Sequence, residues 1–134
     1  GIATRKILSL IPQEASVASE THLIPQLAKR RILMRFPENY KYIDSDRNVQ
    51  KVNLIVSQPR FNSDYSVAFH HHALWLENSL SKMQELVDKN DYGVLFCDSK
   101  GIILKEGYTS LDKEINCFKQ EIKIGLNTLE GIRK

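Results

Sequence analysis

Three adjacent histidines, His70, His71 and His72, are the first side chains in the sequence that could bind a metal ion. We expect them at the start of a helix, where consecutive residues point about 100° apart and cannot converge on one ion. Helical ligands need a spacing of three or four, and apolar residues such as Trp75 stand at that distance. We therefore predict a polar rim and no zinc site. An extended segment, with two of the histidines on one side, is the alternative.

Asp44, Asp46 and Asn48 place carboxylate and amide oxygens on alternate residues, as at the beginning of a calcium-binding loop. Val49 stands where such a loop needs glycine, and Ile55 stands where it needs a bidentate glutamate. An Asp-x-Asp pair also chelates metal in many nucleotide-sugar transferases, but Asp, Ser and Asn are common in turns. We therefore interpret this segment as a turn without a metal.

Cys97 is the candidate nucleophile, but a reactive thiolate needs a nearby histidine and electropositive surroundings. Asp98 follows it, and a neighbouring negative charge raises the pKa of a thiol. We interpret Cys97 as a small core residue, and the sequence leaves open whether it pairs with Cys117. No phosphate-binding glycine loop and no Gly-x-Ser-x-Gly motif can be found. The sequence therefore predicts no catalytic residue, no metal and no cofactor.

Basic residues gather in the first part of the chain, where residues 1–60 hold ten Lys and Arg against five Asp and Glu. Arg30 and Arg31 either end a helix or bind phosphate or anionic headgroups. We expect Arg30 to be ordered and paired with Glu20 or with carbonyls of the helix end, and Arg31 to be more exposed. The candidate binding residues are Glu20, His22, Arg30 and Arg31. A net charge of +3 does not indicate a nucleic-acid partner.

The elements that must position these residues follow from apolar periodicity. Buried strands alternate with helices, which predicts an α/β fold with a small mixed, mainly parallel sheet flanked by helices. A C-terminal hairpin and a tail helix complete it. We expect strands at 15–18, 32–36, 52–56, 94–97 and 102–105, and helices ending at 11, over about 19–30, over 67–89 and over about 111–129. Residues 38–50 and the segment around Pro59 and Asn62 are expected to be loops.

The chain of 134 residues, 42% of them hydrophobic, has the size and composition of one soluble domain. We divide it into an α/β part, residues 1–107, and an amphipathic C-terminal helix, residues 108–134, packed on the same domain. No apolar run approaches the length that spans a bilayer, and no signal peptide is visible.

One set of short motifs resembles a known family. It runs from Ile11-Pro12 through Val17-Ala18 to Leu23, Pro25, Leu27, Arg30 and Phe36-Pro37, and continues at 54–56, 92–94 and 102–104. This pattern resembles an uncharacterised family of predicted multipass membrane proteins, domain of unknown function two thousand seventy-nine, whose members look related to the C superfamily of glycosyltransferases. Gln26 and Ser57 depart from the pattern, since the family has a histidine and often an aspartate there.

The resemblance implies that this chain is the soluble C-terminal domain of a longer membrane protein. In glycosyltransferases of that superfamily the catalytic carboxylate lies in the membrane domain, and the donor is a lipid-phosphate-linked sugar. We therefore expect a non-catalytic accessory domain on the extracytoplasmic side of the cell membrane. Its partners would be the upstream transmembrane domain and lipid headgroups or the lipid-linked sugar.

The alternative function is a free-standing small α/β protein that binds a ligand or a partner. The soluble composition and the amphipathic tail helix support this second hypothesis. An independent enzyme ranks behind both, because the sequence shows no catalytic constellation.

Overall fold

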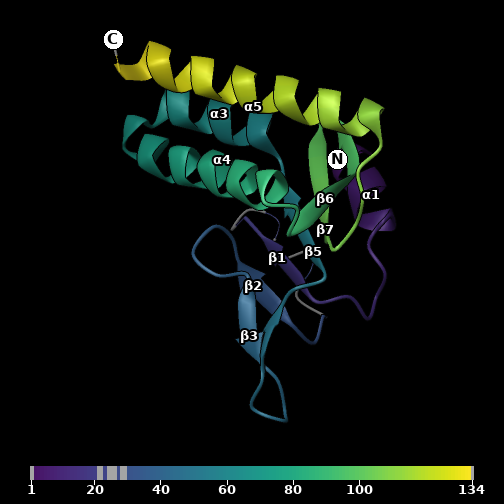
Figure 1. The fold of residues 1–134 in the computed structure, drawn as a ribbon. Coiled ribbons are helices and arrows are strands. Elements are labelled where there is room, and N and C mark those ends of the chain that lie inside the picture. The colour runs from purple at the N-terminus through teal and green to yellow at the C-terminus, as the bar shows by residue number, and fades with distance from the viewer. Residues whose placement is uncertain (1, 21–22, 24–26, 28–29, 134) are drawn as a thin grey trace.

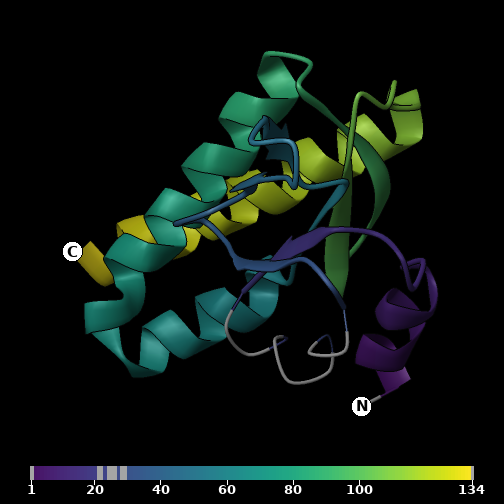
Figure 2. The same ribbon diagram turned by 90° about the horizontal axis from the view of Figure 1, so that it is seen from below.

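Helices cover both faces of a central sheet (Figures 1 and 2). The computed structural model describes residues 2–20, 23, 27 and 30–133. The elements follow in the order α1 (Ile2–Ser9), β1 (Val17–Ser19), β2 (Leu33–Arg35), β3 (Lys41–Ile43), β4 (Val49–Lys51), β5 (Leu54–Ser57), α3 (Pro59–Ala68), the 3₁₀ helix η2 (His70–His72), α4 (Ala73–Asp88), β6 (Tyr92–Asp98), β7 (Gly101–Glu106) and α5 (Asp112–Arg133).

The main sheet has five strands in the order β2-β1-β5-β7-β6. β1 pairs in parallel with β2 and β5, whereas β7 pairs antiparallel with β5 and β6. The expected α/β class is confirmed, but the expectation of a mainly parallel sheet is not exact. The reason is the closing hairpin, because a short turn can join β6 to β7 only in antiparallel orientation, and β7 then also pairs antiparallel with β5.

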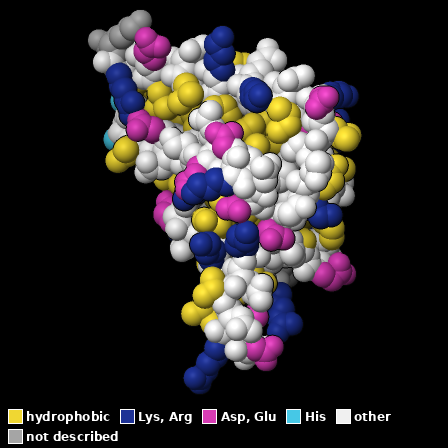
Figure 3. Space-filling view, viewed as in Figure 1, with side chains coloured by type: hydrophobic (Ala, Val, Ile, Leu, Met, Phe, Trp, Pro, Cys, Tyr) yellow, Lys and Arg dark blue, Asp and Glu magenta, His cyan; other side chains and the backbone are white. Residues whose placement is uncertain are grey.

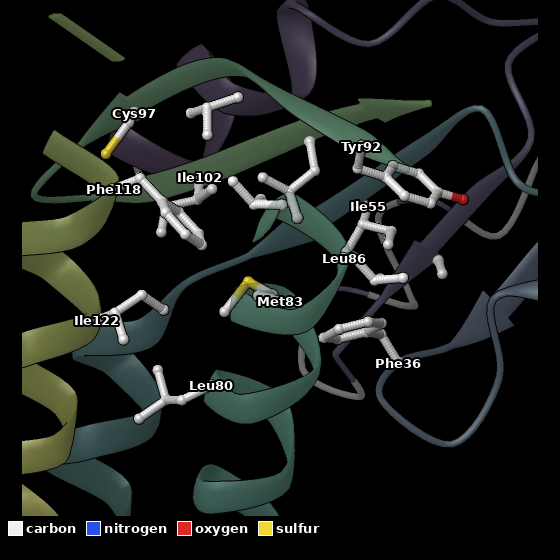
Figure 4. Packing of buried hydrophobic residues seen from close by; sticks show 14 of the residues in the cluster. Phe36, Ile55, Leu80, Met83, Leu86, Tyr92, Cys97, Ile102, Phe118 and Ile122 are labelled. Carbon is white, nitrogen blue, oxygen red and sulfur yellow. The ribbon is translucent and has the colours of Figure 1, made fainter. Parts of the chain in front are cut away.

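Alternating side chains of the strands divide the core into two layers. Leu54, Val56 and Ile103 point to one face, where they pack with Ile7 and Ile11 around the end of α1. Ile55, Ile102 and Leu104 point to the other face, which α4 and α5 cover. Figure 4 shows this second layer, in which Met83 and Leu86 of α4 and Phe118 and Ile122 of α5 extend toward the sheet.

The β6–β7 hairpin is confirmed, with its turn where it was expected. Asp98 Oδ1 accepts hydrogen bonds from the backbone N–H groups of Lys100 and Gly101, at 2.8 and 3.1 Å. Gly93 in β6 is required by close packing, because a Cβ atom there would lie 1.9 Å from the carbonyl oxygen of Tyr108.

The helices after β5 differ from the expectation of one helix over residues 67–89. α3 begins at Pro59, where a loop was expected, and ends at Ala68. Phe69 breaks the helical path with φ −131° and ψ 86°, and its side chain is exposed rather than part of a buried stripe. α4 then starts at Ala73. The helical spacing of apolar residues continues across the break in the sequence, because Phe69 stands four residues before Ala73. The pattern alone therefore gave no sign of the break.

The expected loop at residues 38–50 is also wrong, because β3 and β4 form a hairpin that projects from the five-stranded sheet (Figure 1). Ile43 and Val49 pair across it and are 71% and 68% exposed, so no buried face gave the strands a recognisable pattern. The turn itself is confirmed. Asp44 accepts hydrogen bonds from the backbone N–H groups of Asp46 and Asn48, both at 2.9 Å.

The tail helix α5 is confirmed and packs against α3, α4 and β6. Its buried side chains include Phe118, Glu121, Ile122 and Leu129. Leu126, which was expected on the same stripe, is 41% exposed. The helix expected over about 19–30 lies largely outside the described residues. Of that segment, Leu23 and Leu27 are described, and both are buried in the layer of α1.

Candidate functional site

The strongest concentration of buried polar side chains lies where β1 and β5 end. These strands are parallel neighbours, with Ser19 of β1 opposite Val56 of β5. The next residues, Glu20 and Ser57, therefore emerge side by side at the carboxyl edge of the sheet. β1 is flanked by β2 on one side and β5 on the other, so this edge is a topological switch point. Ligands of open α/β sheets bind at such points.

The Glu20 cluster consists of Glu20, Ser57, Gln58 and Asn62. Glu20 is fully buried, with 0% of its surface exposed. Its Oε1 atom accepts a hydrogen bond from the Ser57 hydroxyl and one from Asn62 Nδ2, the latter at 2.9 Å. Its Oε2 atom accepts a hydrogen bond from the backbone N–H of Gln58 at 3.1 Å. Three donors from β5 and the start of α3 thus hold the carboxyl group.

α3 positions two of these donors because of how it begins. Gln58 is the N-cap residue and Pro59 follows at the first helical positions, where the missing N–H of proline costs little. As the N-cap residue, Gln58 directs its backbone N–H at Glu20 Oε2 instead of into the helix, and Asn62 lies one turn further on the buried face. The hydroxyl of Ser66 donates to the Asn62 carbonyl oxygen at 2.8 Å.

Burial controls the proton affinity of this site. It raises the pKa of Glu20 from 4.5 to about 7, against the opposing effect of the hydrogen bonds from Ser57, Gln58 and Asn62. The carboxyl group can therefore take up or release a proton near neutral pH. A group of this kind can act as a general acid or base. In this structure, however, its oxygens bond to the protein itself and none of its surface is exposed.

The structure separates the three predicted binding residues that it describes. Glu20 lies at the carboxyl end of β1, whereas Arg30 and Arg31 precede β2 at the opposite edge of the sheet. Arg30 does not pair with Glu20. Its Nη2 atom donates to the Ile11 carbonyl oxygen at 3.0 Å, and its buried Nε atom has no hydrogen-bond partner among the residues that the structure describes. His22 lies outside the described residues.

Arg31 is the more exposed of the two arginines, as expected. It lines a surface hollow with a volume of about 400 Å³, together with Tyr42, Asp44 and Asn53. Asp44 Oδ2 already accepts a hydrogen bond from Gln50 Nε2 at 3.0 Å. Asn53 is held at the wall, since its Oδ1 accepts from the Ser16 backbone N–H at 3.0 Å. The hollow therefore combines a cation, an aromatic ring and a fixed amide.

Sequence reasoning missed the donors of the Glu20 cluster. Ser57 was noticed only as a departure from a family pattern, and Asn62 was assigned to a loop. The available signal was Pro59 directly after a buried strand, which marks the first turn of a helix. With α3 recognised, Asn62 falls on its buried face beside the end of β1.

Cys97 and Cys117 form a disulfide, with Cα atoms 6.0 Å apart. This settles the pairing that the sequence left open, and it excludes Cys97 as a free nucleophile in this structure. The bond joins β6 to α5 and thus ties the tail helix to the sheet.

No group of three or more His, Cys, Asp or Glu side chains that could hold a metal ion occurs among the described residues. His70, His71 and His72 form a 3₁₀ helix, and none of the three is buried.

A family model described as "Predicted membrane protein (DUF2079)" matches residues 2–104, which include all of the main sheet except the last two residues of β7. α5 and Cys117 lie beyond the matched range. Comparison with curated proteins and with solved structures gave no match. Over the part of the chain that the structure describes, no helix has both the length and the apolar character needed to cross a bilayer.

Proposed function

The chain belongs to the DUF2079 family of predicted membrane proteins, and from this premise we propose that it is an accessory domain on the extracytoplasmic side of a multipass membrane protein. In this proposal the domain carries no catalytic site of its own. It packs on the transmembrane part of the same protein, which is glycosyltransferase-like and uses a lipid-linked sugar.

The observation that carries the extracytoplasmic assignment is the Cys97–Cys117 disulfide. Disulfides persist in oxidising compartments and are rare in the cytosol. Both cysteines take part in the bond, and the described residues include no free cysteine. A domain facing the cytoplasm would keep these thiols reduced and would lose the bond between β6 and α5.

The Glu20 cluster supports a structural rather than a catalytic role. Glu20 is the one carboxyl group at the switch point whose pKa lies near neutral, yet its hydrogen bonds hold β1, β5 and α3 together. A substrate would have to displace Ser57 or Asn62 to reach it. The glycosyltransferase assignment rests on the resemblance of the short motifs, which places the catalytic carboxylate in the membrane domain.

The hollow beside Arg31 is our candidate for contact with lipid phosphate or with the phosphate of a lipid-linked sugar. Arginine suits such groups because its planar guanidinium donates two parallel hydrogen bonds. The carboxylates of Glu14 and Asp44 at the same hollow restrict the phosphate to the Arg31 side.

Fusion reporters on the full-length protein test the location. Alkaline phosphatase, which needs disulfides to be active, and a fluorescent protein that matures in the cytoplasm are each joined after Lys134. We expect an active phosphatase and a dark fluorescent protein. The reverse result would overturn the extracytoplasmic assignment.

Two further observations bear on the same proposal. The reading frame that encodes this chain is expected to specify transmembrane segments upstream of it. A complete frame without such segments would favour the alternative of a free-standing binding protein. Alkylation of the protein from cells without prior reduction should leave Cys97 and Cys117 unmodified. Quantitative alkylation of both would remove the observation that carries the proposal.

A further inference from the structure

The corner between α3 and α4 carries a chain of ring contacts that the proposed function does not use. We call Tyr65, Phe69, His71, His72 and Trp75 the aromatic corner. The ring of Tyr65 lies 4.8 Å from that of Phe69 and 4.7 Å from that of His72, centroid to centroid. His72 in turn lies 4.8 Å from Trp75, and Phe69 lies 6.2 Å from His71.

This corner gathers much of the exposed apolar surface of the chain. Phe69 is 48% exposed and Tyr65 is 42% exposed. Val67 and Leu74, which flank the rings in sequence, are 57% and 63% exposed. Single exposed apolar side chains are ordinary, but a contiguous group marks an interaction site.

The corner itself carries few charged groups. Residues 65–76 contain no Asp, Glu, Lys or Arg, and a charged side chain in direct contact with the rings is Glu38, which accepts a hydrogen bond from Trp75. Burial and the neighbouring His71 lower the pKa of His72 from 6.5 and so favour its neutral form. The surface is therefore mainly apolar and aromatic, with a carboxylate and no Lys or Arg of its own.

The position of the corner favours a flat occupant. Figures 1 and 2 show the junction of α3 and α4 at the periphery of the molecule, at the end of the helical layer away from β6 and β7. In the space-filling view, histidine side chains appear at the left edge beside hydrophobic ones (Figure 3). A projecting corner can dock on a flat surface, because its partner does not need a groove to receive it.

We propose that the aromatic corner docks into the interfacial region of an electrically neutral lipid bilayer. This inference rests on the proposed function, which places the domain next to a membrane. Tyrosine and tryptophan concentrate at the membrane–water boundary because each has an apolar body and a polar tip. Trp75 shows such a tip, since its Nε1 atom donates to Glu38 Oε1 at 3.1 Å.

Charge complementarity selects neutral lipid over the other occupants. An anionic surface attracts clusters of Lys and Arg, and residues 65–76 have none. Protein interfaces commonly place arginine among their aromatic anchors, which this corner also lacks. A corner without Lys or Arg of its own and with the Glu38 carboxylate at Trp75 matches a zwitterionic headgroup layer better than an anionic one. Docking is then driven by burial of Phe69 and Leu74 rather than by ion pairing.

The sole tryptophan of the chain is Trp75, which makes the test direct. The chain is mixed with phosphatidylcholine vesicles, with and without bromine atoms on the acyl chains near the headgroups. We expect a blue shift of the Trp75 emission, quenching by the brominated lipid, and a partition coefficient that changes little between 50 and 500 mM salt.

Matched variants distinguish binding through the aromatic corner from nonspecific hydrophobic adsorption. Phe69→Ser and Leu74→Ser remove exposed side chains, and each should lower the partition coefficient roughly tenfold. Leu111→Ser and Ile43→Ser remove side chains that are 62% and 71% exposed elsewhere, and they should leave partitioning unchanged. Circular dichroism spectra equal to that of the unaltered chain show that each variant is folded.

Four results would overturn the inference. The first is no blue shift with phosphatidylcholine, and the second is equal loss in the corner and control variants. The third is sedimentation as a dimer that Phe69→Ser dissociates, because the corner would then bind a second copy. Binding only to anionic vesicles, abolished by Arg31→Gln, would likewise count against it. The fusion reporters judge the proposed function independently, so an extracytoplasmic domain without vesicle binding would sink the docking proposal alone.

Discussion

Folding removes the Glu20 carboxyl group from water and surrounds it with three hydrogen-bond donors. The net effect is a pKa of about 7. Desolvation penalises the carboxylate more than Ser57, Gln58 and Asn62 stabilise it. The Glu20 cluster therefore links β1, β5 and α3, and the stability of this link depends on whether Glu20 is protonated. The Arg60–Glu121 ion pair links α3 to α5.

Glu20 should make the protein less stable as the pH rises from about 4.5 to 7. The folded state holds the proton to a higher pH than the unfolded state does, because the pKa rises from 4.5 to about 7 on folding. Stability from this group is full below pH 4.5 and falls as pH approaches 7. That change corresponds to about 3 kcal/mol in the free energy of unfolding.

Urea unfolding of the unaltered chain and of Glu20→Gln between pH 4.5 and 8 measures this effect. The difference between the two should shrink or reverse with rising pH, since glutamine cannot lose a proton. Glu14→Gln, at an exposed carboxyl, should keep the slope of the unaltered chain. Parallel curves for the unaltered chain and Glu20→Gln would show that Glu20 titrates normally.

Arg60→Ala should destabilise the chain by about 1–2 kcal/mol, a value reduced for the exposure of Arg60. The guanidinium donates from Nε and Nη2 to both oxygens of Glu121, each at 2.9 Å, and the Glu121 side chain is only 5% exposed. Truncation leaves this carboxylate buried and unpaired. Lys89→Ala, which breaks an exposed pair with Glu85 on α4, should have a smaller effect. Equal effects in thermal unfolding would mean that burial of Glu121 is unimportant.

Among the elements, α5 packs closely against α4 because it has a glycine at the point of contact with Leu80. A Cβ atom at Gly125 would lie 2.7 Å from Leu80 Cδ1, whereas one at Gly131 meets nothing within 4 Å. The two glycines occupy the same helix and differ in their surroundings. Alanine substitutions at these two positions therefore distinguish the effect of helix propensity from the effect of packing.

Gly131→Ala should stabilise the chain by about 0.5–1 kcal/mol through helix propensity. Gly125→Ala gains the same propensity but forces Leu80 to move, so we expect a net loss of about 1 kcal/mol. Denaturation midpoints of the two variants check this, and stabilisation by Gly125→Ala would show that α4 and α5 can separate without cost.

Elements were predictable from the sequence where one face is buried. The β6–β7 hairpin and α5 follow from Val94, Ile102 and Phe118, which repeat with the period of their element and are buried. β3 and β4 were missed because Ile43 and Val49 face solvent. α3 was missed because its buried face is polar, with Asn62 and Ser66 in place of apolar side chains.

The Glu20 cluster could likewise be predicted only in part from the sequence. Its three donor residues follow Glu20 by 37 to 42 residues in the sequence, and they meet it only through the β1–β5 pairing. Glu20 could be named as a candidate, but its partners depend on which strand lies beside β1. Arg30 was expected to pair with Glu20 or with carbonyls of the helix end, whereas the partner that the structure describes, the Ile11 carbonyl oxygen, belongs to a segment that no local pattern connects with it.

At the scale of the molecule, the sheet separates two hydrophobic layers that share its strands, and the tail helix closes the larger one. The Cys97–Cys117 bond fixes that closure, and its two cysteines have a sequence separation of 20. α5 lies outside the range matched by the family model and yet completes the core through Phe118, Ile122 and Leu129.

Replacing both cysteines with serine should lower the free energy of unfolding by about 3 kcal/mol, the loop-entropy value for a closed loop of this length. Hydrogen exchange should accelerate mainly in α5. Reduction of the unaltered chain provides the control and should reproduce the denaturation midpoint of the double variant. An unchanged midpoint would mean that packing alone holds α5 in place.

The same bond decides how the molecule would respond to a mechanical pull on its C-terminus. Traction would unwind α5 from Arg133 back toward Cys117 and would then pass through the sulfur atoms into Cys97 of β6. The segment between the two cysteines, including β7, would carry no tension. The load would reach an edge strand of the sheet near its C-terminal end, at Cys97 of β6, and the β6–β7 hairpin would stay intact until the disulfide is reduced.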